Sequence, residues 1–157
     1  VEAVVDFASN ALPQLDATFA IVGRAPTQQV LALASDRVIV TDEVSDTRPW
    51  LAAADVVVAP LKLARGLQNK ILEAMAVGRA VVASRAAATG IDAQEGRDLV
   101  VADDPVEPIR ALLADPDRAA ALGRAARARM EARYGWDAVL APLATLVAPA
   151  KAGAYRS

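Results

Sequence analysis

Residues 65–68 combine features that favour the binding of a phosphate group. Gly66 lets the backbone come close to a ligand, and the helix expected to begin at Leu67 would offer free N–H groups and a positive dipole end to an anion. Arg65 adds a guanidinium group beside this turn. A cradle for a phosphate is therefore one interpretation of the segment.

Three polar side chains follow on one side of the expected helix. Asn69, Lys70 and Glu73 fall within about a third of a turn, opposite an apolar side that begins at Leu67 and ends at Met75. Glu73 could accept hydrogen bonds from two neighbouring hydroxyl groups, as acidic residues do for a nucleotide ribose. The alternative is a solvent-facing pair of Lys70 and Glu73 on a surface helix, and spacing alone favours this alternative.

An alternation of short apolar runs and helical stretches must position these residues. Buried strands are expected at residues 18–22, 38–40, 55–59, 80–83 and 98–101. Helices are expected at residues 1–13, 27–34, 46–53, 67–77, 106–114, 117–133 and 136–147. The pattern predicts the α/β class: a doubly wound, Rossmann-like parallel sheet with helices on both faces and a helical C-terminus. Ligands of such sheets bind outside the carboxyl ends of the strands, which here are residues 23–24, 41–44, 60–68 and 84–90.

Composition limits the size and the chemistry of the chain. With 157 residues, 55% of them hydrophobic, residues 1–148 are expected to form one domain and residues 149–157 a flexible tail. The absence of histidine and cysteine excludes a Ser-His-Asp triad and a thiolate nucleophile from this chain. A net charge of −2 argues against a nucleic-acid partner. The apolar runs are shorter than the roughly 20 residues of a membrane span. We therefore expect a cytoplasmic protein.

One segment carries a family pattern. It consists of residues 59–61 (APL), residues 64–76 (ARGLQNKILEAMA), Gly78 and residues 81–84 (VVAS), with weaker matches from about residue 1 to residue 146. In this order the motifs resemble the donor-binding domain of family-4 glycosyltransferases with the GT-B fold. The likeness is greatest to sugar transferases of bacterial exopolysaccharide gene clusters.

The resemblance implies half of a two-domain enzyme. Such an enzyme transfers a sugar from a nucleotide-diphosphate sugar to a glycan or lipid-linked acceptor in polysaccharide biosynthesis, with retention of configuration and without a metal or other cofactor. This chain would be the C-terminal domain that binds the donor. Its partner would be the N-terminal domain of the same enzyme, which binds the acceptor. The chain alone is therefore expected to be inactive, and peripheral association of the full-length enzyme with a membrane is a further expectation.

The resemblance also assigns roles to single residues. Glu73 matches the second glutamate of the family's glutamate-seven-glutamate motif, which binds the ribose, and residues 66–68 match the turn that receives the diphosphate or sugar. Arg65 stands where the family has the first glutamate, and this cation should favour phosphate. Gly23 matches the glycine after the second strand, with Arg24 next to it, and Val44 lies in the loop that contacts the base. The expected donor-binding residues are thus Gly23, Arg24, Val44, Arg65, Gly66, Leu67, Gln68, Lys70 and Glu73, with no catalytic residue or metal ligand assigned.

The likeness further predicts that the family's first strand lies before Val1 and is missing. That strand would sit between the strands at residues 18–22 and 56–59 and would leave both without this partner. Its loss would also remove part of the phosphate-binding loop. The chain is then expected to be an excised part of a longer protein.

Two other function classes remain open at this point. Asp42 and Ser84, each after a predicted strand, are superficially what a phosphorylatable receiver-like signalling domain needs, although no acidic pair and no lysine complete the set. A non-catalytic interaction module derived from the enzyme is the other alternative. A crevice beside Gly66 would support donor binding, whereas an acidic cluster at Asp42 would support the receiver.

Overall fold

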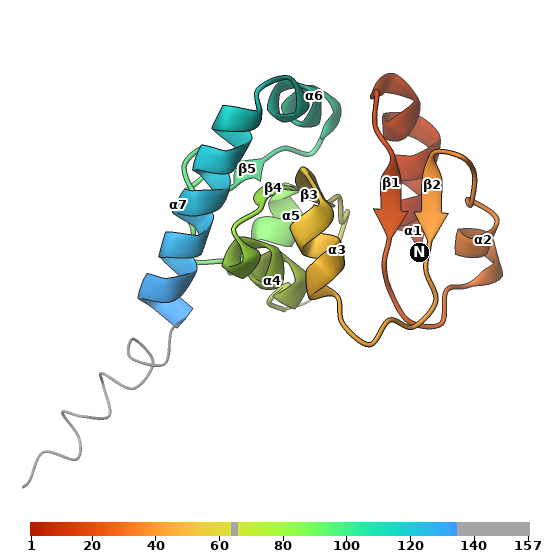
Figure 1. The fold of residues 1–157 in the computed structure, drawn as a ribbon, viewed down its shortest axis with the longest axis horizontal. Coiled ribbons are helices and arrows are strands. Elements are labelled where there is room, and N and C mark those ends of the chain that lie inside the picture. Colours follow the sequence, from red (N-terminus) through yellow and green to blue (C-terminus); the bar gives the residue numbers. More distant parts are fainter. Residues whose placement is uncertain (64–65, 135–157) are drawn as a thin grey trace, which may run out of the picture.

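The computed structural model describes residues 1–63 and 66–134, in which helices and strands alternate along the chain (Figure 1). The strands are β1 (Phe19–Ile21), β2 (Val38–Val40), β3 (Val56–Ala59), β4 (Ala80–Ala83) and β5 (Val100–Val101). The helices are α1 (Glu2–Asp6), α2 (Gln28–Leu31), α3 (Arg48–Ala53), α4 (Asn69–Val77), α5 (Arg85–Ala88), α6 (Val106–Ala114) and α7 (Pro116–Tyr134). A π-helical turn (Phe7–Ala11) and a 3-10 turn (Leu12–Gln14) continue α1.

The expected order of elements is confirmed, with two local differences. The short helix α5 lies in a segment expected to be a loop, and Ser84 starts it by accepting a hydrogen bond from the Ala87 N–H. Helix α4 begins at Asn69 and not at Leu67, because Gln68 keeps an extended backbone conformation. Leu67 therefore precedes the helix and is 45% exposed, so its predicted place on the apolar side of the helix is wrong. The helix expected at residues 136–147 and the tail lie outside the described residues.

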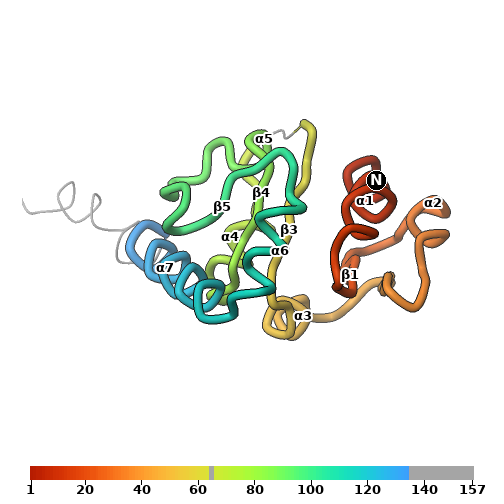
Figure 2. The backbone as a smooth tube through the Cα atoms, turned by 90° about the horizontal axis from the view of Figure 1, so that it is seen from above, coloured from red at the N-terminus to blue at the C-terminus, as the bar shows by residue number. Residues whose placement is uncertain are grey.

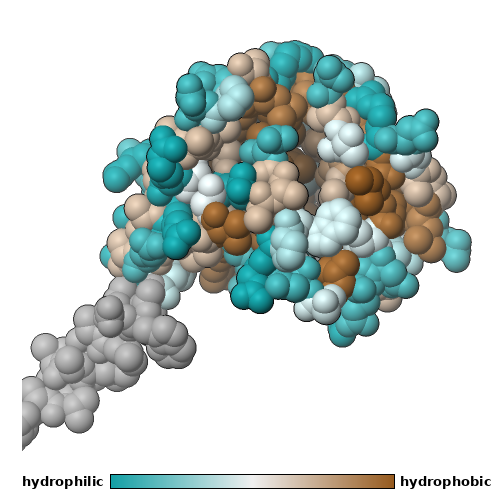
Figure 3. Space-filling view, viewed as in Figure 1, coloured by the Kyte–Doolittle hydropathy of each residue, from teal (hydrophilic) through white to brown (hydrophobic). Residues whose placement is uncertain are grey.

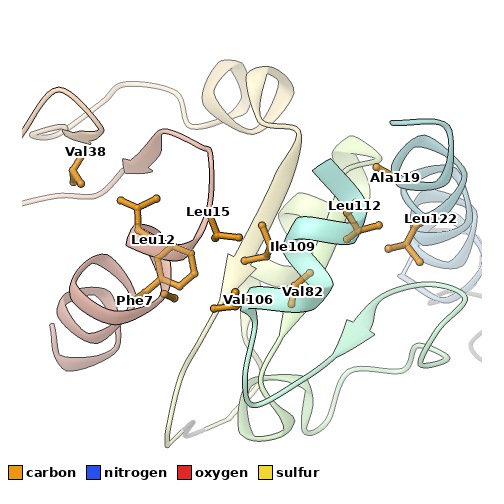
Figure 4. Close-up of a cluster of buried hydrophobic side chains, with 12 residues drawn as sticks. Phe7, Leu12, Leu15, Val38, Val82, Val106, Ile109, Leu112, Ala119 and Leu122 are labelled. Atoms are coloured by element: carbon orange, nitrogen blue, oxygen red, sulfur yellow. The ribbon is translucent and has the colours of Figure 1, made fainter. Parts of the chain in front are cut away.

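Strand β4 is the centre of the larger sheet and is buried on both faces. It pairs in parallel with β3 and β5, and none of its four side chains is more than 2% exposed. Ala80 and Val82 pack with α6 on one face, in a cluster drawn in Figure 4, whereas Val81 and Ala83 pack with α4 and α7 on the other. Successive side chains of β4 point to opposite faces of the sheet, so its four residues contribute to two hydrophobic clusters.

The strands form two sheets, whereas the sequence pattern predicts one. Strands β1 and β2 pair in parallel, and β3, β4 and β5 form a separate parallel sheet. Figure 2 shows the unit of β1, β2, α1 and α2 beside the rest of the described chain. The described residues contain no strand between β1 and β3, and the sheet is divided at this place.

Candidate functional site

The carboxyl edge of the larger sheet opens on a pocket with a volume of about 660 Å³. Its lining comes from the loop after β3, from the segment after β4 and from the segment after β5, and the N-terminal helix closes one side. The lining residues are Asp6, Phe7, Asn10, Ala11, Gln14, Pro60, Leu61, Lys62, Ser84, Arg85, Ala86, Thr89, Asp103, Asp104, Pro105 and Val106. The pocket lies where a parallel α/β sheet ordinarily binds its ligand.

Ser84 fixes the start of the loop that follows β3. Its buried hydroxyl group donates a hydrogen bond to the Leu61 carbonyl oxygen at 2.6 Å and accepts one from the Ala87 N–H at 3.1 Å. One side chain thus joins the segments after two neighbouring strands. The position of Ser84 in a loop after a strand is predictable from the sequence, but its bond to Leu61 spans 23 residues and has no sequence signal.

The charged residues of this pocket are already paired in part. Lys62 lies 3.5 Å from both Glu2 and Asp6, and these carboxylates raise the pKa of the Lys62 ammonium group, with Asp6 as the main cause. Asp103 accepts a hydrogen bond from the Arg85 N–H at 3.0 Å. These contacts tie the N-terminal helix and the segment after β5 to the sheet edge.

The loop expected to hold a diphosphate leads from this edge into α4. Gly66 has a φ of +73°, a conformation that strongly favours glycine, and its carbonyl oxygen accepts a hydrogen bond from Gln68 Nε2 at 3.0 Å. Leu67 approaches Gly90 across the edge. The expected Arg65 lies outside the described residues. The backbone therefore turns at Gly66, three residues before Asn69, where the helix begins.

Lys70 and Glu73 lie on the exposed side of α4, as predicted, and both line a second groove. This groove runs between the two sheets and has a volume of about 580 Å³. Trp50 and Leu51 of α3 lie in the same lining. The ammonium and carboxylate groups of this side of α4 thus face a hollow as well as solvent.

The remaining expected site residues belong to the smaller sheet. The Gly23 N–H donates to Thr41 Oγ1 at 3.4 Å, Arg24 lies 3.9 Å from Glu43, and Val44 is half-buried in the loop after β2. The structure therefore gathers these residues at the carboxyl ends of β1 and β2. It places them on a different unit from the turn at Gly66.

The evidence for a receiver-like site is weak. Asp42 is exposed, and its carboxylate accepts a hydrogen bond from the next backbone N–H, that of Glu43, at 2.8 Å. In residues 1–63 and 66–134, no group of three acidic residues is arranged to hold a metal ion. The acidic cluster that would have favoured a receiver is thus not formed by this part of the chain.

The arginine-rich helix α7 uses two of its cations to hold the loop before β5. Arg129 and Arg133 both bind the Asp92 carboxylate, and the Tyr134 hydroxyl accepts a hydrogen bond from the Asp92 N–H at 3.1 Å. These guanidinium groups, Arg133 first, lower the pKa of Asp92. The arginines therefore have a structural role here.

None of the helices described has the length and apolarity needed to cross a bilayer.

Solved structures of glycosyltransferases share this fold. Sucrose-phosphate synthase from Thermosynechococcus elongatus matches with a TM-score of 0.77 and 22% identity, over 92% of this chain and 41% of that one. HepE of Anabaena in complex with UDP matches with a TM-score of 0.77 and 21% identity, over 93% of this chain and 44% of that one. The chain therefore spans less than half the length of these two proteins.

A third structure corresponds to a single domain. The C-terminal domain of LpcC, a glycosyl transferase group 1 family protein from Francisella tularensis, matches with a TM-score of 0.67 and 18% identity, over 85% of this chain and 77% of that one. These likenesses confirm the doubly wound α/β fold expected for half of a GT-B enzyme. A comparison with curated proteins finds no match.

The sequence profile of one family supplies the identification. The profile described as glycosyl transferases group 1 matches residues 1–115, which is most of the chain. Its match covers the described elements from α1 to α6 and therefore both sheets and the turn at Gly66. The chain belongs to the glycosyl transferases group 1 family.

Proposed function

We propose that this chain is the C-terminal, donor-binding domain of an enzyme that uses a nucleotide-diphosphate sugar. Family membership supports sugar transfer. Two similar structures are described as HepE in complex with UDP, and with UDP and glucose. The likeness to the separately solved C-terminal domain of LpcC supports the position of this domain in the enzyme.

The observation that carries the proposal is the turn at Gly66 in front of α4. Its positive φ directs the chain into a helix whose exposed side bears Lys70 and Glu73. The backbone of residues 66–68 would receive the diphosphate, and Arg65 and Lys70 would supply positive charge. Glu73, farther along the helix, would accept hydrogen bonds from the ribose hydroxyl groups.

The smaller sheet would also contact the nucleotide, at a phosphate and at the base. In this proposal Gly23 leaves room at the carboxyl end of β1, Arg24 reaches a phosphate, and Val44 contacts the base. The whole enzyme would transfer a hexosyl group with retention, without a metal or other cofactor, to a glycan or lipid-linked acceptor bound by an N-terminal domain. Exopolysaccharide synthesis at the cytoplasmic side of a membrane is the process that we propose for it.

The decisive experiment measures donor binding by the whole enzyme with and without the Glu73 carboxylate. Calorimetry with UDP, GDP and ADP first identifies the nucleotide, and Glu73→Gln is then compared with the native enzyme. We expect a loss of about 1–3 kcal/mol, or roughly 5- to 150-fold in Kd, because charge-assisted hydrogen bonds to the ribose are lost. Glu131→Gln, which removes an exposed carboxylate of α7, is the matched control and should leave the Kd unchanged. Equal affinities of the Glu73 variant and the native enzyme would overturn the assignment.

The isolated chain provides a second test. In this proposal another domain binds the acceptor. We therefore expect no sugar transfer by the 157-residue chain from any nucleotide sugar, because the reacting groups of an enzyme must be brought together for catalysis. Incubation of the 157-residue chain with radiolabelled nucleotide sugars and chromatography of the products checks this. Sugar transfer faster than in buffer without protein would contradict the proposal that donor and acceptor are bound by two different domains.

A further inference from the structure

The loop between β3 and α4 has few contacts that fix its course. Its described residues are 60–63 and 66–68, and in these the Leu61 carbonyl oxygen is the only backbone group hydrogen-bonded to a described segment outside the loop and α4. Leu63 is 90% exposed, and Lys62 contacts other segments through its charged end alone. The position of the loop therefore depends on what holds Leu61.

Ser84, directly after β4, supplies the partner of this carbonyl group. Its hydroxyl group donates to the Leu61 carbonyl oxygen at 2.6 Å and accepts a hydrogen bond from the Ala87 N–H at 3.1 Å. A serine hydroxyl has a single hydrogen, so the bond from Ala87 leaves that hydrogen to Leu61. Ser84 is only 6% exposed, so little water reaches the bond.

The segment that presents Ser84 is itself held in place. The Ser84 N–H donates to the Ala59 carbonyl oxygen at 3.0 Å and so extends the pairing of β4 with β3. The Arg85 N–H donates to the Asp103 carboxylate at 3.0 Å, and the Thr89 hydroxyl group donates to the Arg85 carbonyl oxygen at 3.0 Å. Ser84 thus extends from a fixed support to a loop that has few other contacts.

The same segment meets the loop again near its far end. Gly90 has a φ of +83°, and a methyl group placed on it would lie 4.0 Å from Leu67 Cδ1. Leu61 and Ile91 pack against the same hydrophobic cluster. Residues 84–91 therefore contact the loop just after it leaves β3 and again just before it enters α4.

We propose that Ser84 is a positioning residue for donor binding, whose hydroxyl group holds the loop after β3 so that the turn at Gly66 can offer its backbone to the diphosphate. The inference rests on the proposed function of residues 66–68. Because its hydrogen is directed at Leu61, Ser84 acts through the loop and not by contact with the nucleotide.

The rest of the proposed site does not need Ser84 for its position. Ile71 and Met75 anchor α4 in the core, with exposures of 1% and 0%. Lys70 and Glu73 of the same helix line the hollow that Figure 3 shows between the two parts of the molecule. The turn at Gly66 must be placed relative to this fixed helix, and a loop that is already in position binds more tightly because less ordering accompanies binding.

The first experiment measures donor binding by variants of the whole enzyme. Ser84→Ala should raise the Kd of the nucleotide selected from UDP, GDP and ADP by roughly 3- to 10-fold, and the donor KM by the same factor. The kcat at saturating donor should stay within about twofold, because the loop contributes binding and not a reacting group. Ser84→Thr keeps the hydroxyl group and should bind within about twofold of the native enzyme.

The control distinguishes positioning from helix capping. The Asp115 carboxylate accepts a hydrogen bond from the Arg118 N–H at 3.0 Å at the start of α7, so Asp115→Ala removes a cap away from the loop. It should lower stability and leave the Kd unchanged. The same result for Ser84→Ala would show that Ser84 merely caps α5, and would overturn the proposal, as would a Ser84→Thr variant as weak as Ser84→Ala. Should Ser84→Ala not fold, Ser84→Cys takes its place, because a thiol is a weak donor, and an unchanged Kd would again overturn the proposal.

The second experiment needs no nucleotide. In the whole enzyme with ¹³C-labelled leucine methyl groups, Ser84→Ala should shift or broaden the NMR signals of Leu61 and Leu67 but not that of Leu99, which is buried under the same sheet. Unchanged Leu61 and Leu67 signals would overturn the proposal. If the native enzyme bound none of the three nucleotides, the proposed function would fail, and the leucine signals would still show whether Ser84 holds the loop.

Discussion

Strands β4 and β1 have similar compositions but opposite surroundings. The four residues of β4 are at most 2% exposed, whereas Phe19 and Ile21 of β1 are half-buried and Ala20 between them is exposed. Both strands are short and apolar, and both lie in parallel sheets. The difference is that β4 has a strand on each side and helices on both faces, while β1 pairs with β2 alone. Burial of a strand is therefore set by its neighbours and not by its own residues.

The same contrast extends to the two units that contain these strands. In the larger unit, α4 and α7 pack against each other and against β4, with Met75 and Ala126 fully buried. In the smaller unit, Ile39 of β2 is 45% exposed although it lies in the middle of a strand. We therefore expect the larger unit to provide most of the stability of the chain.

The largest expected effect comes from shortening one apolar side chain in each unit. Met75→Ala in the 157-residue chain should lower the free energy of unfolding by about 2–5 kcal/mol, because a fully buried side chain leaves a cavity. Ile39→Ala should cost less than about 1 kcal/mol, because much of its surface already contacts water. Urea titrations of both variants measure these costs. Equal costs would remove the proposed difference between the units.

A second prediction concerns the contact between α7 and the end of α4. A methyl group at Gly123 would collide with the Gly78 carbonyl oxygen, so Gly123→Ala should destabilise the chain by about 1–3 kcal/mol through overpacking. Helix propensity alone predicts a gain of roughly 1 kcal/mol, so the sign distinguishes the two effects. Ala121→Gly, on the exposed side of the same helix, is the control and should show only the propensity term. Thermal or urea unfolding gives the sign, and a stabilised Gly123→Ala variant would refute the close contact.

A smaller effect is expected where Arg37 holds the smaller unit together. Its guanidinium group donates to the carbonyl oxygens of Leu12, Leu15 and Ala17 and so fastens the N-terminal helical segment to β1 and β2. Arg37→Met keeps the length of the side chain and should cost about 1 kcal/mol, since the arginine is exposed to solvent screening. Hydrogen exchange should accelerate in β1 and β2 but not in β4. Arg118→Met is the exposed control, and a uniform change across both sheets would contradict a local role for Arg37.

The smallest expected effect depends on pH and concerns the Asp92 contact in the larger unit. Because Arg133 and Arg129 lower the pKa of Asp92 below its ordinary value of 3.8, its stabilising contribution is complete above that value. It is lost as the pH falls through the lowered pKa, when the carboxylate takes up a proton. The stability difference between native chain and Asp92→Asn should therefore be present at pH 6 and disappear in acid, as urea titrations from pH 7 to pH 2 would show. Asp36→Asn serves as the control, and a difference that persists unchanged in acid would contradict the ion-pair explanation.

Several elements of the fold could be predicted from local sequence. The apolar runs predicted the five strands found in the described part of the chain, and Gly78, with a φ of +80°, ends α4 where the sequence indicated. The exposed side of α4 with Lys70 and Glu73 followed from helical spacing alone. Helix α5 was missed because four residues carry too little periodicity, and Leu67 was misplaced because the backbone of Gln68 delays the helix.

The sequence by itself therefore determined the alternation of elements, the family pattern and the chemical types at the candidate site, because each of these depends on residues close together in the chain. Tertiary structure alone decided that Ser84 holds the loop after β3 and that Lys70 and Glu73 face a groove. Strand pairing and packing join residues that are far apart in the chain, and their free energy depends on the partners that each edge and face finds. A local sequence pattern predicts that a strand is apolar, but it does not predict which strands will lie beside it.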